Sequence, residues 1–324
     1  MYMKKSILIA AALVALVPSF AAEPVSVEIT DGLDNAALKT KMELTMSSLL
    51  TEINAAQEEA RNLNFGKLNL PKNVAVSLSM LWENSPFMCT DDVIVEKCLV
   101  TPNGYQIRNI PLMMTPRNDR HFNESEYQEA VISFDRKGEV ESFYLSLDLN
   151  LYMQVIKSNL EVKDLRRREL ILDYVEHFRT AYNQKDLPFL EQVFSDDALI
   201  ITGKVIKRRS SDNIPLPDKI TYKKQTKREY LTNLRRVFNA NSYIRVTFDD
   251  IKVMRDGARP NYYGVTLHQG YSSSSYHDEG YVFLLWDFTD EEAPVVHVRT
   301  WQPDQFNGKP LPEDEIFSLA DFDF

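Results

Sequence analysis

Cysteine and glycine are scarce in this chain, and the signatures of several common protein classes are missing. Its 324 residues include 2 cysteines and 10 glycines. No low-complexity stretch and no repeat of solenoid length is visible, which argues against repeat architectures. No nucleophile elbow, phosphate loop, zinc-hydrolase motif or dinucleotide fingerprint is present either. These absences exclude the commonest enzyme families, leave other enzymes open, and give no reason to expect a cofactor.

Basic charge is in short supply as well. The chain has 37 Lys and Arg residues against 47 Asp and Glu residues, a formal net charge of −10 at pH 7. This acidity favours solubility and argues against a general nucleic-acid-binding role. A chain of about 300 residues is long enough for two ordinary domains.

Long apolar runs are missing beyond the start of the chain. Two lysines precede the apolar run 6–17, and Pro18 follows it. The segment Ser19-Phe20-Ala21 then places small residues at the two positions that a signal peptidase recognises. This is the pattern of a secretory signal peptide over residues 1–21, cleaved after Ala21. The run is too short to span a bilayer comfortably, and no similar run follows it. The sequence therefore predicts a periplasmic or secreted protein that does not span a membrane.

The two cysteines, Cys89 and Cys98, are close in the sequence. In an oxidising compartment a disulfide between them would close a loop of about ten residues and stabilise the fold by roughly 2.5 to 3 kcal/mol. Two buried free thiols are the alternative. No histidine or cysteine at ligand spacing accompanies them, so a metal site is not expected there. The pair is a disulfide candidate, with both states open.

Residues 22–157 show helical patterns followed by strand patterns. Apolar residues recur at three- and four-residue spacing over 33–64, and a shorter helical pattern covers 74–83. The turn ending in Gly138 predicts a hairpin, because glycine can adopt the positive φ that a tight turn requires. Strands are predicted at 93–100, 105–113, 127–134 and 140–149. This order predicts an N-terminal α+β domain with a long helix and antiparallel strands.

A linker at 158–164 precedes a second domain at 165–303, and residues 304–324 form a tail. The domain opens with a helix at 165–183 and a short helix at 187–194. A further helix is predicted at 226–239. Strands are predicted at 198–206, 219–225, 243–254, 261–271, 279–288 and 294–302.

The opening of the second domain resembles the NTF2-like superfamily (nuclear transport factor 2, ketosteroid isomerase and SnoaL-type proteins). The resemblance rests on residues 174–186, a helix ending in Ala-Tyr-Asn followed by a Lys-Asp-Leu turn, and on the Phe-Ser-Asp-Asp-Ala entry into the first strand at 194–198. It covers about residues 165–303. It implies a cone-shaped, bent antiparallel sheet wrapped on three helices, with a pocket inside the cone. Activity does not follow, because the superfamily hosts enzymes, binders and scaffolds.

Five polar or aromatic residues on the last strands are candidates for this pocket: Tyr263, Gln269, Asp287, Arg299 and Trp301. Ketosteroid isomerase-like members use a pocket Asp as general base, so the resemblance implies that Asp287 is either such a base or, as we favour, a cap of the next turn. Arg299 either anchors an anionic ligand or, as we favour, pairs with a carboxylate across the sheet. A one-residue slip between 281–288 and 294–302 would change which residue Asp287 faces, so no catalytic set is predicted.

Several potential metal ligands gather around a run of serines at 272–275. They are His268, His277, Asp278 and Glu279. Their spacing matches no standard metal site, and hairpin tips naturally collect such residues. No metal site is therefore predicted. His177 is expected on the surface of the helix 165–183.

Charge is distributed unevenly along the second domain. Residues 202–236 are strongly basic, and the candidates for partner binding are Lys204, Lys207, Arg208, Arg209, Lys223 and Lys224. This stretch is either a docking face for an anionic partner or a solvated hairpin. Residues 313–324 are acidic and aromatic with no base. This tail could fold back on the hairpin, contact a neighbour, or be disordered.

These observations favour an exported, non-enzymatic binding or assembly protein of the bacterial envelope. Its partner would be an unknown protein or an anionic envelope component, and a homodimer through the sheet is an option. The alternative is a SnoaL- or ketosteroid isomerase-like enzyme that acts on a small hydrophobic carbonyl compound in the cone pocket. A chaperone or inhibitor role is also left open.

Overall fold

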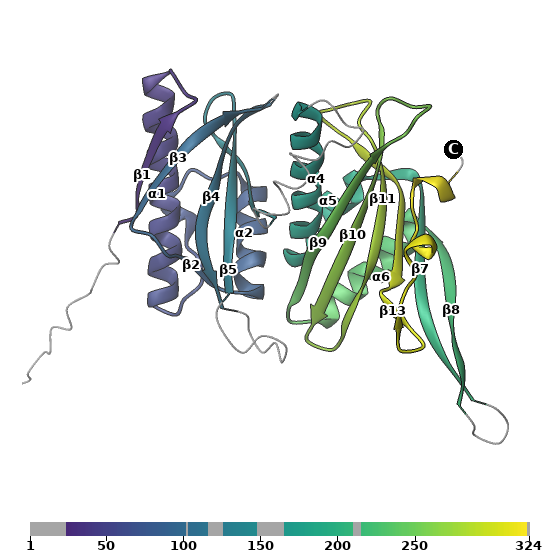
Figure 1. Cartoon of the computed structure of the whole chain (residues 1–324). Helices are drawn as coiled ribbons and strands as arrows, with labels where there is room; N and C mark the ends of the chain where they lie inside the picture. The colour runs from purple at the N-terminus through teal and green to yellow at the C-terminus, as the bar shows by residue number, and fades with distance from the viewer. Residues whose placement is uncertain (1–23, 102, 116–125, 148–164, 210–214, 323–324) are drawn as a thin grey trace, which may run out of the picture.

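The computed structural model describes residues 24–101, 103–115, 126–147, 165–209 and 215–322. The predicted signal peptide 1–21 and the linker 158–164 lie outside these residues. Two units follow one another along the described chain, each with its own sheet and buried core (Figure 1). The α+β class predicted from the order of the patterns is confirmed.

The N-terminal unit packs two α-helices against a sheet with the strand order β1-β3-β4-β5-β6, and β2 pairs with β4. Its elements are β1 (Ser26–Asp31), α1 (Ala36–Glu58), a 3-10 turn (Phe65–Lys67), α2 (Lys72–Asn84), β2 (Phe87–Cys89), β3 (Val93–Val100), β4 (Gly104–Met114), β5 (Glu126–Asp135) and β6 (Val140–Leu145). β1 and β3 are parallel, and the other pairs are antiparallel. The predicted helices and strands are present, whereas β1 and β2 were not predicted.

Helix α1 illustrates how this sequence builds the first core. Asn35 caps the helix, because its side chain accepts a hydrogen bond of 3.1 Å from the Leu38 backbone N–H. The predicted β5–β6 turn is confirmed, and Gly138 adopts a φ of 73° there. A Cβ at Gly138 would come within 2.6 Å of the Leu38 side chain, so both the turn and the helix packing require glycine. The buried face of α1 repeats every three or four residues: Met42, Met46, Leu49, Leu50, Ile53 and Ala56.

The candidate disulfide is not formed in this structure. Cys89 and Cys98 are both buried and free. Cys89 pairs with Leu112 of β4, and Cys98 pairs with Ile107 of the same strand. Five residues of strand separate those two positions, roughly 16 Å at about 3.3 Å per residue. Disulfides need Cα atoms within about 7 Å, so the alternative of two buried thiols holds here.

The C-terminal unit has a second sheet of strand order β8-β7-β12-β11-β10-β9. β12 and β7 are parallel, and the remaining neighbours are antiparallel. Each of its helices and strands corresponds to one predicted from the sequence. They are α4 (Leu165–Asn183), α5 (Leu187–Val193), β7 (Phe194–Arg209), β8 (Pro215–Thr226), α6 (Lys227–Ala240), β9 (Ile244–Arg255), β10 (Tyr262–Ser273), β11 (His277–Asp287) and β12 (Val295–Pro303).

The tail folds back onto the outer face of this second sheet. It forms a short hairpin, β13 (Gln305–Phe306) with β14 (Lys309–Pro310), and then two 3-10 turns (Glu313–Glu315 and Leu319–Asp321). Phe317 and Phe322 pack against a small outer cluster that includes Phe283. Phe317 also meets Tyr222 of β8 edge-on at 5.4 Å. The tail thus occupies part of the sheet face through which a homodimer was envisaged, and that homodimer remains a prediction.

The two units meet along α4, which stands between the first sheet and β9 (Figure 1). Arg108 of β4 donates hydrogen bonds of 2.6 and 2.9 Å to Glu176 of α4, whose side chain is 0 % exposed. Asn84 of α2 accepts a hydrogen bond of 2.7 Å from the Ile244 backbone N–H. Buried polar groups of this kind need their partners, so these contacts hold the units in one arrangement. Among the described residues, no helix combines the length and the apolar character required to cross a membrane.

Candidate functional site

A cavity of about 610 Å³ opens into the C-terminal unit, between α4, α6 and the second sheet. We call it the C-terminal cavity. Its walls are mostly aromatic and polar side chains from these elements. They include Tyr182, Thr202, Lys204, Tyr222, Lys223, Tyr230, Gln269, Tyr271, Tyr276, Asp278, Arg299 and Trp301. Three cationic side chains and one carboxyl line it, so its local charge opposes that of the acidic chain.

Arg299 is the buried charge of this cavity, with 6 % of its surface exposed. Its guanidinium lies 5.2 Å from the ring centre of Tyr230 and 5.9 Å from that of Tyr182. The hydroxyl groups of those two tyrosines share a hydrogen bond of 2.6 Å. The Nε atom of Arg299 is buried and has no hydrogen-bond partner among the described residues. A buried donor without a partner is costly, and Arg299 lines the cavity, where an anionic group of a ligand would compensate its charge.

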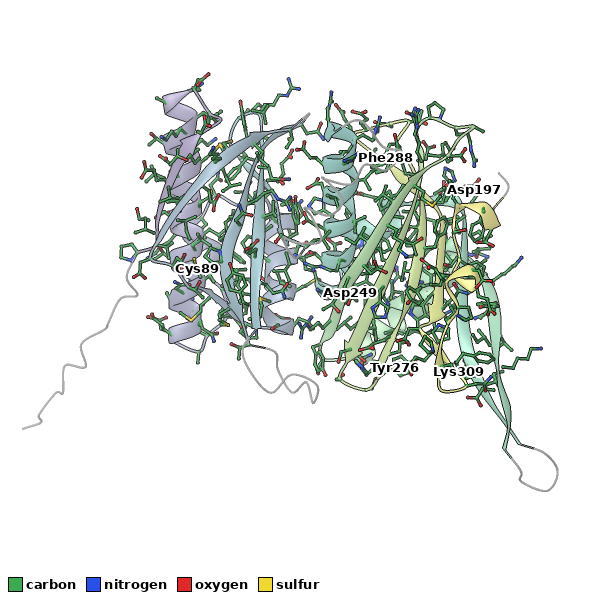
Figure 2. All side chains as sticks on the ribbon, viewed as in Figure 1. Cys89, Asp197, Asp249, Tyr276, Phe288 and Lys309 are labelled. Carbon is green, nitrogen blue, oxygen red and sulfur yellow. The ribbon has the colours of Figure 1, made fainter. Side chains whose placement is uncertain are left out.

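Asp278 is the one carboxyl in the lining of this cavity. Burial raises the pKa of Asp278 above its ordinary value, and a hydrogen bond with Tyr276 and the charge of Arg299 oppose that rise. Tyr276 lies beside the turn between β10 and β11, at the opposite end of the sheet from Phe288 (Figure 2). The carboxyl is therefore held near the β10–β11 end, where it could accept or release a proton.

Of the five residues predicted to line the pocket, Gln269, Arg299 and Trp301 line the C-terminal cavity. Tyr263 does not line it. Its ring packs against Phe288 at 5.9 Å and belongs to the hydrophobic core. Gln269 lies six residues further along the same strand, about 20 Å away, so the two share a face but not a site.

Asp287 also lies outside the C-terminal cavity. It caps the turn after β11, because its carboxylate accepts hydrogen bonds from the Thr289 N–H at 2.8 Å and hydroxyl at 2.6 Å. The same carboxyl lies 3.5 Å from His297. Strand β11 pairs Leu284 with Arg299, and Asp287 pairs with Val295. The favoured structural interpretation of Asp287 as a turn cap holds, whereas no ion pair of Arg299 with a carboxylate is formed among the described residues.

Sequence reasoning missed the tyrosines that shape the C-terminal cavity. Tyr182 was considered as part of the Ala-Tyr-Asn helix end, and Asp278 was assigned to a hairpin tip. The signal that could have identified them is their position along the elements. Tyr182 lies near the end of α4, and Tyr276 and Asp278 lie around the start of β11. Only the folded sheet shows that these positions converge on Arg299.

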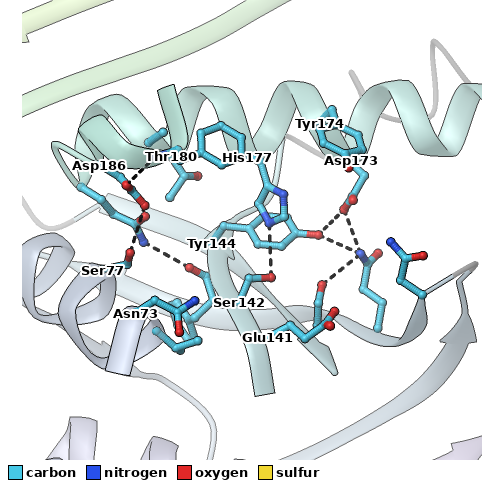
Figure 3. Close-up of a pocket in the computed structure, with 18 of the residues that line it drawn as sticks. Asn73, Ser77, Glu141, Ser142, Tyr144, Asp173, Tyr174, His177, Thr180 and Asp186 are labelled. Atoms are coloured by element: carbon cyan, nitrogen blue, oxygen red, sulfur yellow. Dashed lines mark hydrogen bonds between the residues drawn. The ribbon is translucent and has the colours of Figure 1, made fainter. Parts of the chain in front are cut away.

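A second cavity, of about 310 Å³, lies where the two units meet. We call it the junction cavity. Figure 3 shows Asp173 and His177 pointing from α4 toward Tyr144 and Ser142 of β6. Tyr144 donates a hydrogen bond to Asp173, and the Gln106 amide donates to Asp173 at 2.9 Å. The lining thus combines side chains of both units.

His177 lies inside the junction cavity, which corrects its assignment to the helix surface. Its Nε2 lies 3.3 Å from the Ser142 hydroxyl, and its ring meets Tyr144 at 3.8 Å. Burial lowers the pKa of His177 below its ordinary value. The imidazole is therefore neutral around neutral pH, because desolvation disfavours its charged form. The helix face that carries it was read as solvated because no sequence pattern revealed the N-terminal sheet opposite.

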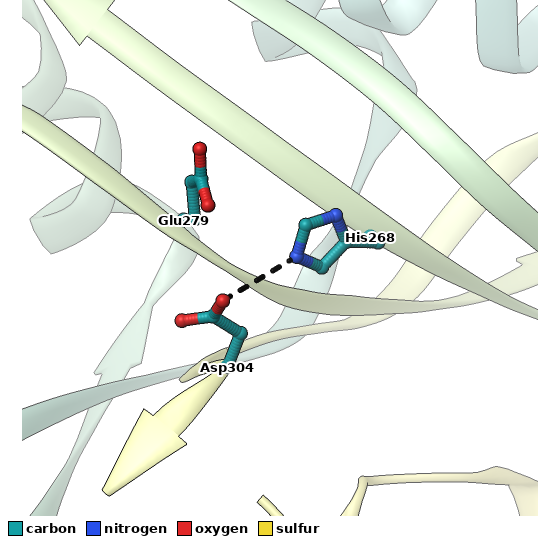
Figure 4. A group of neighbouring side chains, drawn as sticks. All are labelled: His268, Glu279 and Asp304. Atoms are coloured by element: carbon teal, nitrogen blue, oxygen red, sulfur yellow. Dashed lines mark ion pairs between the residues drawn. The ribbon is translucent and has the colours of Figure 1, made fainter. Parts of the chain in front are cut away.

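His268, Glu279 and Asp304 form a small cluster on three neighbouring segments (Figure 4). Their ligand atoms lie within 4.8 Å of one another. His268 Nδ1 is 2.6 Å from Asp249 of β9, which turns Nε2 toward Asp304 at 3.8 Å. These side chains are of the type that binds a divalent metal. Sequence reasoning grouped His268 with Glu279 but missed Asp249 and Asp304, because strand register alone brings them together.

The basic stretch forms the β7–β8 hairpin, which extends beyond the rest of the unit (Figure 1). Lys204, Lys223 and Lys224 are exposed on it, and the first two line the C-terminal cavity. The side chains of Lys207, Arg208 and Arg209 lie outside the described residues. The described lysines therefore join the predicted basic face to the cavity.

No protein-family model matches the sequence, and no curated protein matches it. Among solved structures, an NTF2-like protein from Cytophaga hutchinsonii is similar over 42 % of this chain and 97 % of its own, with 16 % identity and a TM-score of 0.32. ActVI-ORFA from Streptomyces coelicolor is similar over 42 % of this chain and 96 % of its own, with 12 % identity and a TM-score of 0.31. Bd1075 from Bdellovibrio bacteriovorus is similar over 45 % of this chain, which covers 44 % of that protein, with 12 % identity and a TM-score of 0.33. The neighbours named NTF2-like thus match under half of this chain, as the sequence resemblance predicted, and the rest is unrecognised.

Proposed function

We propose that this protein is an exported binding protein whose C-terminal cavity holds a small molecule with an aromatic or apolar body and an anionic group. The proposal includes the cone-shaped wall that the NTF2-like resemblance implies. Export rests on the lysines and the apolar run at the start of the sequence. Arg299 carries the proposal, because it is a buried cation that lines the cavity among aromatic rings.

The exposed lysines indicate the side from which an anionic ligand would approach the C-terminal cavity. Lys204 and Lys223 line the cavity, and Lys224 stands next to Lys223 on β8. Basic groups around a cleft raise the local concentration of anions and the rate of association. An anionic partner would therefore be drawn to the hairpin and its acidic group delivered to Arg299, while the rings of Tyr230 and Trp301 cover the body of the ligand.

The test compares a carboxylate with its neutral analogue. We expect 4-phenylbutanoate to bind more tightly than 4-phenylbutanamide by about tenfold or more, since hydrogen bonds to charged groups contribute about 1.5 to 3 kcal/mol. Binding is measured by isothermal titration calorimetry. Arg299→Gln should remove the difference, and Arg299→Lys should keep only part of it, because lysine lacks the guanidinium fork. Equal binding of acid and amide by the wild type would overturn the proposal.

Asp278 supports a second function, catalysis of proton transfer on a small hydrophobic carbonyl compound. Its carboxyl is partly buried and has a raised pKa, as general acids and bases often do. The measurement is deuterium exchange next to the carbonyl of 4-phenyl-2-butanone, followed by nuclear magnetic resonance. An enzyme should accelerate the exchange, and Asp278→Asn should abolish that acceleration without abolishing binding. Absence of any acceleration in the wild type would leave binding alone.

A further inference from the structure

The wall of the junction cavity is acidic. Three carboxyl groups face it from three elements: Glu141 of β6, Asp173 of α4 and Asp186 before α5. Glu291 also lines it but is paired with Arg167 at 2.6 Å. No lysine or arginine lines it among the described residues. The cavity therefore has a negative potential that no side chain in its wall cancels.

Arg108 is a partly buried arginine near this wall. Both oxygens of Glu176 accept its hydrogen bonds, at 2.6 and 2.9 Å, which offsets much of its charge. Asp173 accepts hydrogen bonds from Tyr144 and Gln106, yet a carboxylate offers about four acceptor positions. Glu141 forms no hydrogen bond or ion pair with another described residue, and its exposed side chain lines the cavity. Acceptor capacity is therefore left over for a ligand.

Aromatic rings complete the wall. Phe143, Tyr144, Tyr174 and Phe189 line the junction cavity, and His177 among them is neutral because burial lowers its pKa. Ring faces attract cations, and most strongly where water is excluded. Carboxylates and rings around a cavity of about 310 Å³ are what a small organic cation requires.

We propose that the junction cavity binds a small alkylammonium ion, with its charge near Asp173 and Glu141 and its carbon body against Tyr144 and Tyr174. The ligand would contact both units, since α2, β6 and α4 all supply lining residues. This site is separate from the C-terminal cavity and would take a ligand of opposite charge. The inference does not depend on the function proposed for Arg299.

Two matched pairs of probes test the charge requirement. Choline is compared with 3,3-dimethyl-1-butanol, which has the same shape without the charge, and 1,4-diaminobutane with 1,4-butanediol. Binding is followed by calorimetry on the full chain at low salt. We expect saturable binding of at least one ammonium compound with a Kd below about 10 mM and none of its alcohol counterpart.

Glu141→Gln and Asp173→Asn should each weaken ammonium binding by about tenfold or more, since each removes a charged acceptor. Glu141 forms no internal contact that the exchange would break, so this variant is expected to fold. The matched control is Glu28→Gln, an exposed acid of β1 outside the lining that changes net charge equally. Failure of both ammonium probes to saturate at about 10 mM, equal binding of the alcohols, or equal loss in the control would each overturn the proposal.

Discussion

The C-terminal cavity and the junction cavity are lined by opposite charges, and one helix serves both. Tyr182 of α4 faces the C-terminal cavity, where Arg299, Lys204 and Lys223 outnumber Asp278. Asp173, nine residues earlier on α4, faces the junction cavity with its acidic wall. The two cavities should therefore favour ligands of opposite charge, although a single helix joins them. Position on a helix face, more than residue composition, decides which chemistry each side of α4 offers.

The two cavities also differ in what holds them open. The C-terminal cavity belongs to one sheet and its helices, whereas the junction cavity exists only while both units stay docked. The docking rests on polar contacts buried across the junction, among them Arg108 with Glu176. Breaking that docking should consequently damage one site and spare the other.

The largest expected effect comes from Glu176→Gln. Removing one partner of a buried ion pair leaves Arg108 uncompensated and should lower the free energy of unfolding by about 3 kcal/mol or more. Urea unfolding measures this. The control is Glu139→Gln, whose partner Lys41 is 2.5 Å away but whose pair is about 40 % exposed, so it should cost under about 1 kcal/mol. Equal losses in the two variants would show that the junction is not held by this pair.

Two variants, each titrated with both ligands, test whether the two cavities bind their ligands independently. Arg299→Gln should weaken 4-phenylbutanoate binding by about tenfold and leave choline binding unchanged, and Glu141→Gln should do the reverse. Both variants are titrated with both ligands by calorimetry. A change in both affinities from either single exchange would mean that α4 couples the sites energetically or that one cavity takes both ligands, and the comparison would fail.

The pH dependence of the free energy of unfolding should show whether His177 is buried. Because burial lowers its pKa in the folded protein, the unfolded chain binds the proton first, so stability falls as pH drops below about 6.5. At about pH 5.5 the wild type should have lost roughly 1 kcal/mol more than His177→Gln, relative to each protein at pH 7.5. Urea unfolding at the two pH values measures the difference. Parallel pH profiles would mean that His177 is solvated, as its sequence position alone suggested.

Much of the fold could be predicted because its signals are local. Helix α4 begins at Leu165, where the helical pattern begins, and β3 covers the residues of the predicted strand 93–100. β1 was missed because it is held by parallel pairing with β3, far along the chain. The choice between a disulfide and two free thiols stayed open because the sequence proximity of Cys89 and Cys98 does not reveal that they pair with distant parts of β4.

Residues of the C-terminal cavity could be predicted only where side chains alternate regularly between the two faces of a strand. Arg299 and Trp301 alternate into the cavity as expected, but the β11–β12 ladder shifts register between Leu285 and Trp286. That shift decides that Asp287 pairs with Val295 of β12, and nothing in the sequence marks it. The junction cavity could not be foreseen at all, because its wall combines side chains of two units that lie far apart in the sequence.

The smallest expected effect concerns two adjacent lysines of β8. Lys223 lines the C-terminal cavity and Lys224 does not, although both are exposed and their neutralisation changes net charge equally. Lys223→Gln should weaken 4-phenylbutanoate binding by about two- to fivefold and Lys224→Gln by less, because exposed charge pairs contribute about 0.2 to 1 kcal/mol. Calorimetry at low salt and at about 0.5 M salt should show the difference shrinking, since salt screens exposed charges. Equal effects of the two exchanges would assign the lysines to general attraction by the hairpin and leave Arg299 as the sole local anchor. A larger effect of Lys224→Gln would contradict the placement of the ligand in this cavity.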